Sequence, residues 1–238
     1  MRNVRMIIEY DGTDYAGWQK QPGGANTVQG VLEAALSRIV QEPVLLTAAG
    51  RTDRGVHARG QVANFRTESA ISLERLMHAV NGLLPDTVCV RNIREVSDTF
   101  HARYSALVRE YRYFILEKRS AIDQRYAGYH GFPLDLERLN LCAKEIVGRH
   151  DFAVYAKGCS SAENTFCTVY GTAWGRHEDM VVFRISANRF LRTMVRFLVS
   201  AQLGASPGEL EETLRTGRLL KSLVPVDPAG LFLWQVVY

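Results

Sequence analysis

The order in which strand-like and helix-like patterns alternate constrains the fold of this chain more than any other feature. Val4–Tyr10 alternates apolar and mixed residues and predicts a strand that ends at Asp11-Gly12. Thr27 is a good N-cap for a helix over Val28–Val40, whose apolar residues form one stripe. The further expected elements are strands at Val44–Ala49, Gly60–Phe65 and Val88–Val96, and a helix from the Ser72 cap to about Leu84, before Pro85. The first half is therefore expected to read β-α-β-β-α-β.

The second half repeats this order. Its expected elements are a strand at Val108–Glu117, a helix at Leu136–Val147, strands at Thr168–Gly175 and Met180–Ser186, a helix at Arg189–Leu203 and a strand at Leu231–Tyr238. Ser206-Pro207 is typical of a helix start, because a cap is followed by Pro, and predicts a short additional helix.

Two halves of the same order predict the α+β class. We expect two similar split-βαβ (ferredoxin- or RRM-like) halves that form a continuous antiparallel or mixed sheet, with helices on one side and a central basic cleft. The N-terminal half is placed at residues 1–102 and the C-terminal half at residues 103–238. No low-complexity linker separates them, so rigid packing is expected.

Composition limits the classes of protein that need to be considered. No apolar run approaches the roughly 18 residues that a membrane helix needs, and charges interrupt the N-terminal apolar residues. A cytoplasmic location is expected by default. The four cysteines, Cys89, Cys142, Cys159 and Cys167, show no CxxC spacing, so we interpret them as incidental thiols and expect no metal site.

Positive charge is modest in total but locally concentrated. The net charge is +4, with 24 Arg against 5 Lys. Arg suits phosphate and stacks on bases, although a genome rich in Arg codons explains the bias equally well. Residues 180–208 contain no carboxylate but include Arg184, Arg189, Arg192 and Arg196, which predicts a positive patch and a nucleic-acid partner.

The segment Ala49–Ala58 combines an isolated carboxylate with several cations. Asp53 is the one carboxylate between Glu42 and Glu68, an interval that also holds Arg51, Arg54, Arg59, Arg66 and His57. Flanking glycines at 50 and 55 permit tight-turn geometry. Guanidinium neighbours are expected to lower the pKa of Asp53, which suits a nucleophile or an anchored ion pair better than a general acid or base. An Asp that only braces a turn is the alternative.

Two further stretches carry unusual polar and aromatic content. On the strand around Arg109-Glu110-Tyr111-Arg112-Tyr113, Arg109, Tyr111 and Tyr113 are expected to share one face. Such tyrosines usually pack in a core, but a Tyr between two arginines also suits stacking on a nucleobase.

The second stretch is Asn188–Arg196. On a helix, residues 189, 192 and 196 fall in one narrow sector. Arg189 and Arg192 are interpreted either as a solvated helix face or as phosphate contacts. Arg196 has apolar neighbours in sequence and is expected to need a partner, for which Asp53 is a candidate.

Taken together, these segments resemble the tRNA pseudouridine synthase A family. The resembling motifs are Tyr10-Asp11-Gly12-Thr13 with Gly17-Trp18-Gln19-Lys20-Gln21-Pro22, the segment Gly50–Ala58, the segment Phe100–Ala106 followed by Tyr111-Arg112-Tyr113, and Asn188–Arg196. They occur in order across nearly the whole chain. Thr193 stands where many relatives have His, and Arg196 stays in register.

The resemblance implies a function and a set of site residues. Asp53 would be the nucleophilic aspartate, Tyr111 would contact the target base, and Arg196 would pair with the aspartate. Arg51 would help to hold the target nucleotide out of its stack. The implied reaction isomerises uridine to pseudouridine in the anticodon arm of tRNA, at positions 38, 39 and 40. It needs no cofactor, and the family acts as homodimers. Attack at C6, attack at C1′ and a glycal route all stay open.

Two other functions are weighed against this one. A non-catalytic RNA-binding protein would use Tyr111, Tyr113 and the arginines to bind strands, with Asp53 only bracing a turn. A metal-dependent nuclease is the second alternative, and the isolation of Asp53 from other carboxylates speaks against it.

Overall fold

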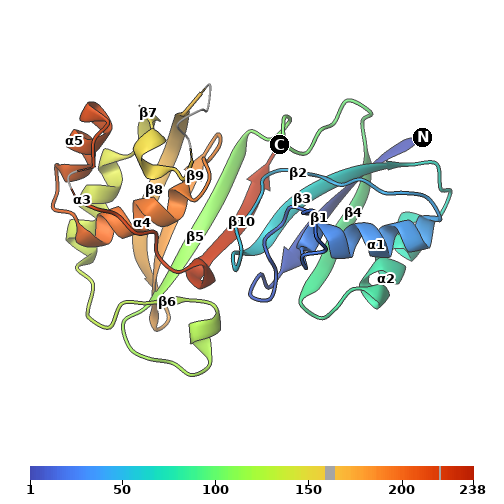
Figure 1. Ribbon diagram of the computed structural model, residues 1–238, viewed down its shortest axis with the longest axis horizontal. Helices are drawn as coiled ribbons and strands as arrows, with labels where there is room; N and C mark the ends of the chain where they lie inside the picture. Colours follow the sequence, from blue (N-terminus) through green and yellow to red (C-terminus); the bar gives the residue numbers. More distant parts are fainter. Residues whose placement is uncertain (159–163, 220) are drawn as a thin grey trace. The chain divides into compact units, whose positions relative to one another are not determined.

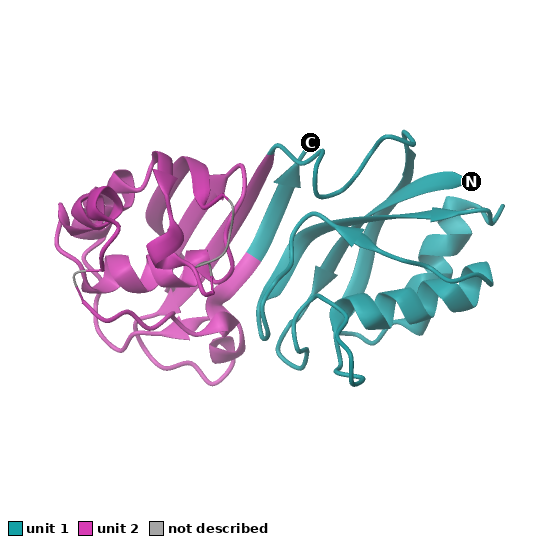
Figure 2. Cartoon of the chain, turned by 45° about the horizontal axis from the view of Figure 1, so that its top comes forward, with its two compact units in different colours: residues 1–107, 233–238 teal, residues 108–232 magenta. Residues whose placement is uncertain are grey.

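The structure, a computed structural model, describes residues 1–158, 164–219 and 221–238. These residues form ten strands and five α-helices in two compact units (Figures 1 and 2). Unit 1 comprises Met1–Leu107 together with Leu233–Tyr238, and unit 2 comprises Val108–Phe232. The expected α+β class is confirmed. The last six residues belong to unit 1, whereas the expected division at residue 102 assigned them to the C-terminal half.

Unit 1 shows the expected order of elements. These are β1 (Arg2–Tyr10), α1 (Val28–Val40), β2 (Thr47–Ala48), β3 (His57–Thr67), α2 (Leu73–Leu83) and β4 (Val88–Val96), and the chain returns at its end with β10 (Leu231–Val237). The strand order is β4-β1-β3-β10, with β2 paired to β3. Strand β1 is antiparallel to both β3 and β4. As expected, Thr27 and Ser72 cap the helices, each accepting a backbone N–H with its hydroxyl oxygen.

Both faces of β1 are buried, one with apolar side chains and the other with polar side chains. Helices α1 and α2 lie on one face of the sheet (Figure 1), and Val4, Met6 and Ile8 are completely buried. Side chains alternate along a strand, so the opposite face carries Asn3 and Arg5, which are also buried. Unit 1 therefore has an apolar core on one side of the sheet and a polar packed layer on the other.

Unit 2 repeats the order with additions. Its elements are β5 (Val108–Leu116), β6 (Gly128–Tyr129), α3 (Leu136–Glu145), β7 (Gly148–Asp151), β8 (Phe166–His177), β9 (Met180–Ala187), α4 (Met194–Gly204) and α5 (Glu209–Thr216). Three short 3-10 turns lie at Asp123–Arg125, Ala153–Tyr155 and Pro228–Gly230. The strand order is β5-β9-β8-β7, antiparallel throughout, and β6 pairs in parallel with β5.

Three sequence expectations are corrected, the first at Val44–Ala49. Only Thr47 and Ala48 form a strand, because the backbone N–H groups before them are used elsewhere. The Val44 N–H donates to the Ser37 hydroxyl oxygen at 2.9 Å, and the Leu46 N–H donates to the Glu33 carboxylate at 3.0 Å. Side chains of α1 therefore take the place of a neighbouring strand.

The second correction concerns the helix expected from Arg189. Helix α4 begins only at Met194, because Thr193 adopts a left-handed conformation with φ 64°. Asn188 still belongs to the end of the sheet, where its backbone N–H donates to the Thr168 carbonyl at 3.1 Å. Residues 189–193 thus form a loop, and Arg189 and Arg192 do not share a helical face with Arg196.

The third correction concerns the start of the short helix expected at Ser206-Pro207, which is present but begins two residues later. Helix α5 begins at Glu209, preceded by Gly208 with φ 93°. The Glu145 carboxylate, at the end of α3, accepts the N–H groups of Gly208, Leu210 and Glu211 at 2.6, 3.2 and 3.1 Å. A carboxylate from another helix therefore satisfies the free amides and the positive dipole end of α5.

The described residues also show where three of the four cysteines lie. Cys142 and Cys167 are buried and Cys89 is exposed, whereas Cys159 lies outside the described residues. Among the helices of the described part of the chain, none has both the length and the apolar character required to span a membrane.

Replacing Glu145 should loosen α5 without unfolding the rest of the chain. We expect Glu145→Ala to lower the local free energy of unfolding by about 1–2 kcal/mol, because three amides lose an anionic acceptor. Hydrogen exchange of peptides covering residues 209–216, followed by mass spectrometry, measures this directly. The matched control is Glu211→Ala, which removes an exposed carboxylate from the same helical turn. Equal exchange in the two variants would contradict the capping role.

Candidate functional site

Asp53 lies on a loop between β2 and β3 that is fixed at both ends. At its start, the Ala49 N–H donates to the Val62 carbonyl at 2.8 Å, and the Gln61 amide donates to the Gly50 carbonyl at 2.7 Å. At its end, the Val56 N–H donates to the Asp53 carbonyl at 3.2 Å across Gly55, whose φ is 76°. The positive φ expected among these glycines is therefore found at Gly55. The backbone around Asp53 is held in one tight turn.

The segment that contains Tyr10, Gly17 and Trp18 packs against the loop that carries Asp53. The Trp18 N–H donates to the Thr52 carbonyl at 3.1 Å, and the Tyr10 and Thr52 hydroxyls are 2.7 Å apart. A Cβ on Gly17 would lie 2.8 Å from the Thr52 carbonyl oxygen, so only glycine permits this close approach. Trp18 and Tyr10 are buried, and burial raises the pKa of Tyr10, which keeps its hydroxyl protonated.

His57, the first residue of β3, supports the same loop. It is fully buried, and its Nδ1 accepts the Gly12 N–H at 3.0 Å and lies 3.2 Å from the Asp11 carboxylate. Asp11 also accepts the Thr13 N–H at 3.0 Å. Sequence reasoning did not identify this support for the loop. The sequence offered only the glycines themselves, at positions where the structure brings two backbones together, Gly12 against Val56 and Gly17 against Thr52.

The exposed surface of the loop is charged. Arg51 and Arg54 are exposed, Asp53 is partly exposed, and Thr52 between them is buried. The loop therefore presents one carboxylate between two guanidinium-bearing residues to solvent. This arrangement suits an anionic ligand that must approach a carboxylate, since the cations offset its charge.

Tyr111 and the loop 189–193 are brought together within unit 2. The Tyr111 ring meets the Phe190 ring edge-on with centroids 5.1 Å apart, and the Arg109 guanidinium donates to the Asn188 carbonyl at 2.6 Å. Arg109, Tyr111 and Tyr113 are all buried, as expected for one face of the strand. Tyr111 is only 8% exposed, so any ligand contact through this residue is confined to a small part of its surface.

Arg196 is hydrogen-bonded to the chain segment before the last strand. Its Nε donates to the Val226 carbonyl at 2.7 Å. The neighbouring Tyr113 hydroxyl donates to the Asp227 carbonyl at 2.9 Å. Burial and the Asp227 carboxylate raise the pKa of Tyr113, while the charge of Arg196 lowers it. The pairing of Arg196 with Asp53 stays a prediction.

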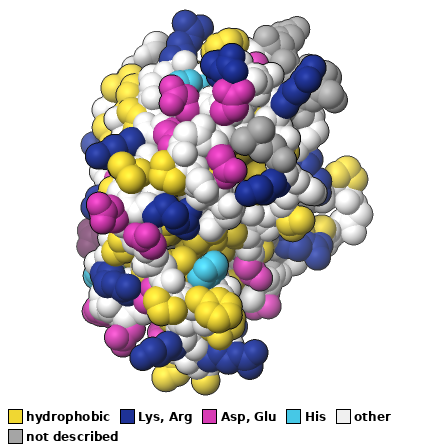
Figure 3. Space-filling model, turned by 90° about the vertical axis from the view of Figure 1, so that its left-hand side faces the viewer, with side chains coloured by type: hydrophobic (Ala, Val, Ile, Leu, Met, Phe, Trp, Pro, Cys, Tyr) yellow, Lys and Arg dark blue, Asp and Glu magenta, His cyan; other side chains and the backbone are white. Residues whose placement is uncertain are grey.

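Arg189 and Arg192 have exposed side chains, in agreement with either of their interpretations. The Arg192 carbonyl accepts the Lys157 N–H at 3.1 Å, which helps to hold the loop. Elsewhere on unit 2 the charges are mixed: on the face around α3 and α5, Lys and Arg side chains alternate with Asp and Glu (Figure 3). That face is therefore not a uniformly basic surface.

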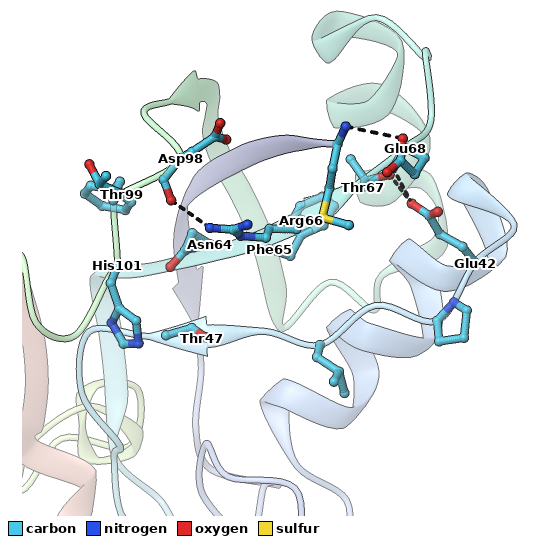
Figure 4. A pocket seen from close by; sticks show the side chains of 14 residues that line it. Glu42, Thr47, Asn64, Phe65, Arg66, Thr67, Glu68, Asp98, Thr99 and His101 are labelled. Carbon is cyan, nitrogen blue, oxygen red and sulfur yellow. Dashed lines mark hydrogen bonds and ion pairs between the residues drawn. The ribbon is translucent and has the colours of Figure 1, made fainter.

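A separate hollow of about 510 Å³ lies in unit 1 (Figure 4). Its walls come from the start of the chain, the segment after α1, β3 and the segment after β4, and include Glu42, Thr47, Arg66, Asp98 and His101. Neither Arg51 nor Asp53 lines it. In the part of the chain that the structure describes, no cluster of three or more His, Cys, Asp or Glu residues could hold a metal ion.

Comparison with known proteins assigns the chain to a family. The family model described as tRNA pseudouridine synthase matches residues 6–105 and 142–238. A tRNA pseudouridine synthase A of Chlorobaculum tepidum is 51% identical, covering 100% of this chain and 98% of the relative. Proteins of the same name from Chlorobium luteolum and a Thermoanaerobacter species are 49% and 39% identical, covering 100% of this chain and 96% and 100% of their own lengths.

The fold, the loop and these matches define an RNA-modifying isomerase. The chain belongs to the tRNA pseudouridine synthase family. Its substrate is tRNA, in which it converts uridine to pseudouridine.

Gly12 should be irreplaceable because it touches the loop that carries Asp53. A Cβ at this position would overlap the Val56 carbonyl, so Gly12→Ala must displace backbone. We expect a fall in stability of about 2 kcal/mol or more and a large loss of pseudouridine formation. Thermal unfolding and a tritium-release assay on tRNA measure the two effects.

The matched control is Gly82→Ala. Gly82 lies in α2 with no atom within 4 Å of an added Cβ. Alanine should therefore raise helix stability by up to about 1 kcal/mol and leave activity intact. Similar behaviour of the two variants would refute the steric explanation.

Proposed function

We propose that this enzyme isomerises uridines at positions 38, 39 and 40 in the anticodon arm of tRNA, with Asp53 as the nucleophile. The main support for this proposal is the loop itself. It holds a partly exposed carboxylate between exposed Arg51 and Arg54 and is fixed by buried Tyr10 and Trp18. A rigid backbone turn holds the carboxylate ready for reaction at no further entropic cost. A residue that merely braced a turn would need neither the exposure nor the cations.

The target uridine must leave its stack before the carboxylate can reach it. Unstacking costs a few kcal/mol, which contacts with protein have to offset. We assign this task to the exposed Arg51, two residues from Asp53, and to the small exposed part of Tyr111. In the reaction the N1–C1′ bond breaks, the base turns, C5 bonds to C1′, the C5 proton leaves, and N1 takes up a proton. Electrons balance without an oxidant or reductant.

The first covalent step has three chemically reasonable forms. Asp53 adds to C6 of the ring as the C5=C6 electron pair shifts toward the C4 carbonyl, displaces N1 of the base from C1′ of the sugar, or removes a proton from C2′ as the base leaves C1′, which gives a glycal. Each form uses an ionised carboxylate. We assign Arg196 the role of keeping that carboxylate oriented and charged. The bond of Arg196 to the Val226 carbonyl helps to hold the guanidinium in place and supports this role.

The wider setting of the enzyme completes the proposal. We propose that it acts on the anticodon stem-loop as a homodimer in the cytoplasm, and that Arg189 and Arg192 bind tRNA phosphates. The exposure of both side chains on a loop held by Asn188 and Lys157 supports the phosphate contacts.

Asp53→Asn should abolish turnover while tRNA still binds. The amide keeps the shape of the side chain but cannot act as an anionic nucleophile. Pseudouridine is mapped at single-nucleotide resolution on unmodified tRNA, and affinity is measured by filter binding. Asp86→Asn, an exposed Asp before β4, serves as the control and should retain full activity.

Two outcomes would overturn this part of the proposal. Pseudouridine formed by Asp53→Asn would remove the nucleophile assignment. Wild-type protein that binds tRNA but never forms pseudouridine would favour the non-catalytic RNA-binding alternative. Product at other positions would leave the nucleophile assignment standing and refute only the anticodon-arm site.

Replacing Arg189 or Arg192 with Ala should weaken tRNA binding and flatten its salt dependence. Each lost phosphate contact should reduce the slope of log K against log salt by about one unit. Titrations over a range of potassium chloride concentrations give the slope. Arg75→Ala, an exposed residue of α2, is the control and should leave the slope unchanged. Slopes for Arg189→Ala and Arg192→Ala that equal the wild-type value would show that these side chains are merely solvated.

A further inference from the structure

The segment 97–106, which carries the motif Phe100–Ala106, is fixed by buried amides of the polar layer of unit 1. The Asn3 side chain donates to the carbonyls of Ser97 and Phe100, both at 2.9 Å. The Asn64 side chain donates to the Asn3 side-chain oxygen at 2.9 Å and accepts the Ala102 N–H at 2.9 Å. Because these amides are buried and satisfied, the network specifies one position for the segment.

Aromatic packing reinforces the same position. The Tyr238 hydroxyl donates to the Ala102 carbonyl at 2.7 Å, and the Tyr238 and Phe100 rings lie 4.9 Å apart. The buried Arg5 guanidinium lies 4.9 Å from the Tyr238 ring centroid. Ala102 is completely buried. The backbone of Ala102 is therefore held through both its N–H and its carbonyl.

Arg103 and Tyr104, the two residues that follow Ala102, are exposed. His101 Nδ1 accepts the N–H groups of Arg103 and Tyr104 at 3.2 and 3.3 Å, and the Ser105 N–H donates to the His101 carbonyl at 2.9 Å. The Tyr104 ring lies 4.4 Å from the His101 ring, inclined by 32°. Tyr104 is nevertheless 77% exposed. A rigid anchor thus supports an aromatic ring that contributes little to the core.

The surroundings of Tyr104 suit a nucleic acid. The Arg103 guanidinium lies 5.7 Å from the Tyr104 ring centroid, which places a cation beside the exposed ring. His101 also lines the hollow of Figure 4, where it faces Thr47 and where Arg66 supplies a further cation. An exposed aromatic ring with a cation beside it is the combination that stacks an unpaired base and holds its phosphates.

We propose that Tyr104, supported by His101 and flanked by Arg103, is a stacking platform for an unpaired tRNA base other than the reacting uridine. This inference rests on the proposed function, since it takes tRNA as the ligand. The platform contributes affinity and register rather than chemistry. Side chains of the motif Phe100–Ala106 thus have a role in binding tRNA, and the backbone of the motif anchors the platform.

Affinity and rate measured separately test the proposal. Tyr104→Ala should raise the Kd for unmodified tRNA roughly five- to 150-fold, the range expected for loss of one stacked base. Tyr104→Phe should bind like wild type, because the ring is kept. Single-turnover pseudouridine formation at saturating enzyme should stay close to the wild-type rate in both variants. Tyr170→Ala, an exposed tyrosine of unit 2, is the matched control and should leave Kd unchanged.

The outcomes separate this inference from the proposed function. Wild-type protein that forms no pseudouridine refutes the proposed function, while the Kd comparison still tests the platform. An unchanged Kd for Tyr104→Ala in an active enzyme overturns the platform alone. A loss of affinity that Phe does not restore also overturns it, as does a change in mass by light scattering with tRNA affinity intact, which would assign the ring to a protein interface.

Discussion

The position of the Asp53 carboxylate depends on how Thr52 is held. Its carbonyl accepts the Trp18 N–H, and its hydroxyl bonds to that of Tyr10, both in a buried environment. Breaking either bond would leave a buried polar group unsatisfied, which is far more costly than losing a surface contact. The next residue in the chain is Asp53, so the constraint on Thr52 becomes a constraint on the carboxylate. Gly17 and Gly12 are required because the supporting backbone touches the loop.

Local sequence patterns predicted most of the fold. Helix α1 and strand β4 have the expected bounds, and Thr27 and Ser72 cap their helices as expected, because periodicity and capping depend on neighbouring residues. The errors have long-range causes. Glu33 and Ser37 take the amides before β2, and Glu145 caps α5 from another helix. No local pattern in the sequence indicates such partners.

The roles of the candidate site residues stay predictions, whereas the local structure around them can be compared with the sequence. The loop of Asp53 and Arg51 was recognised from its charges and glycines, and the structure shows these side chains at least partly exposed. The loop at Arg189 and Arg192 was mistaken for a helix, because nothing in the sequence indicates the left-handed Thr193. The burial of Tyr111 agrees with core packing, one of its two interpretations, but its partner Phe190 lies far away in the chain and could not be identified from the sequence.

The discontinuity of unit 1 has a consequence for biosynthesis. Strand β3 lies next to β10, which the ribosome delivers only after all of unit 2. Until then the nascent domain keeps an unpaired sheet edge, the feature that favours pairing with other chains. Tyr238 and its bond to Ala102 also arrive last. Translation must therefore finish before unit 1 can reach its native state, and chaperones that shield open β-edges would matter most in that interval.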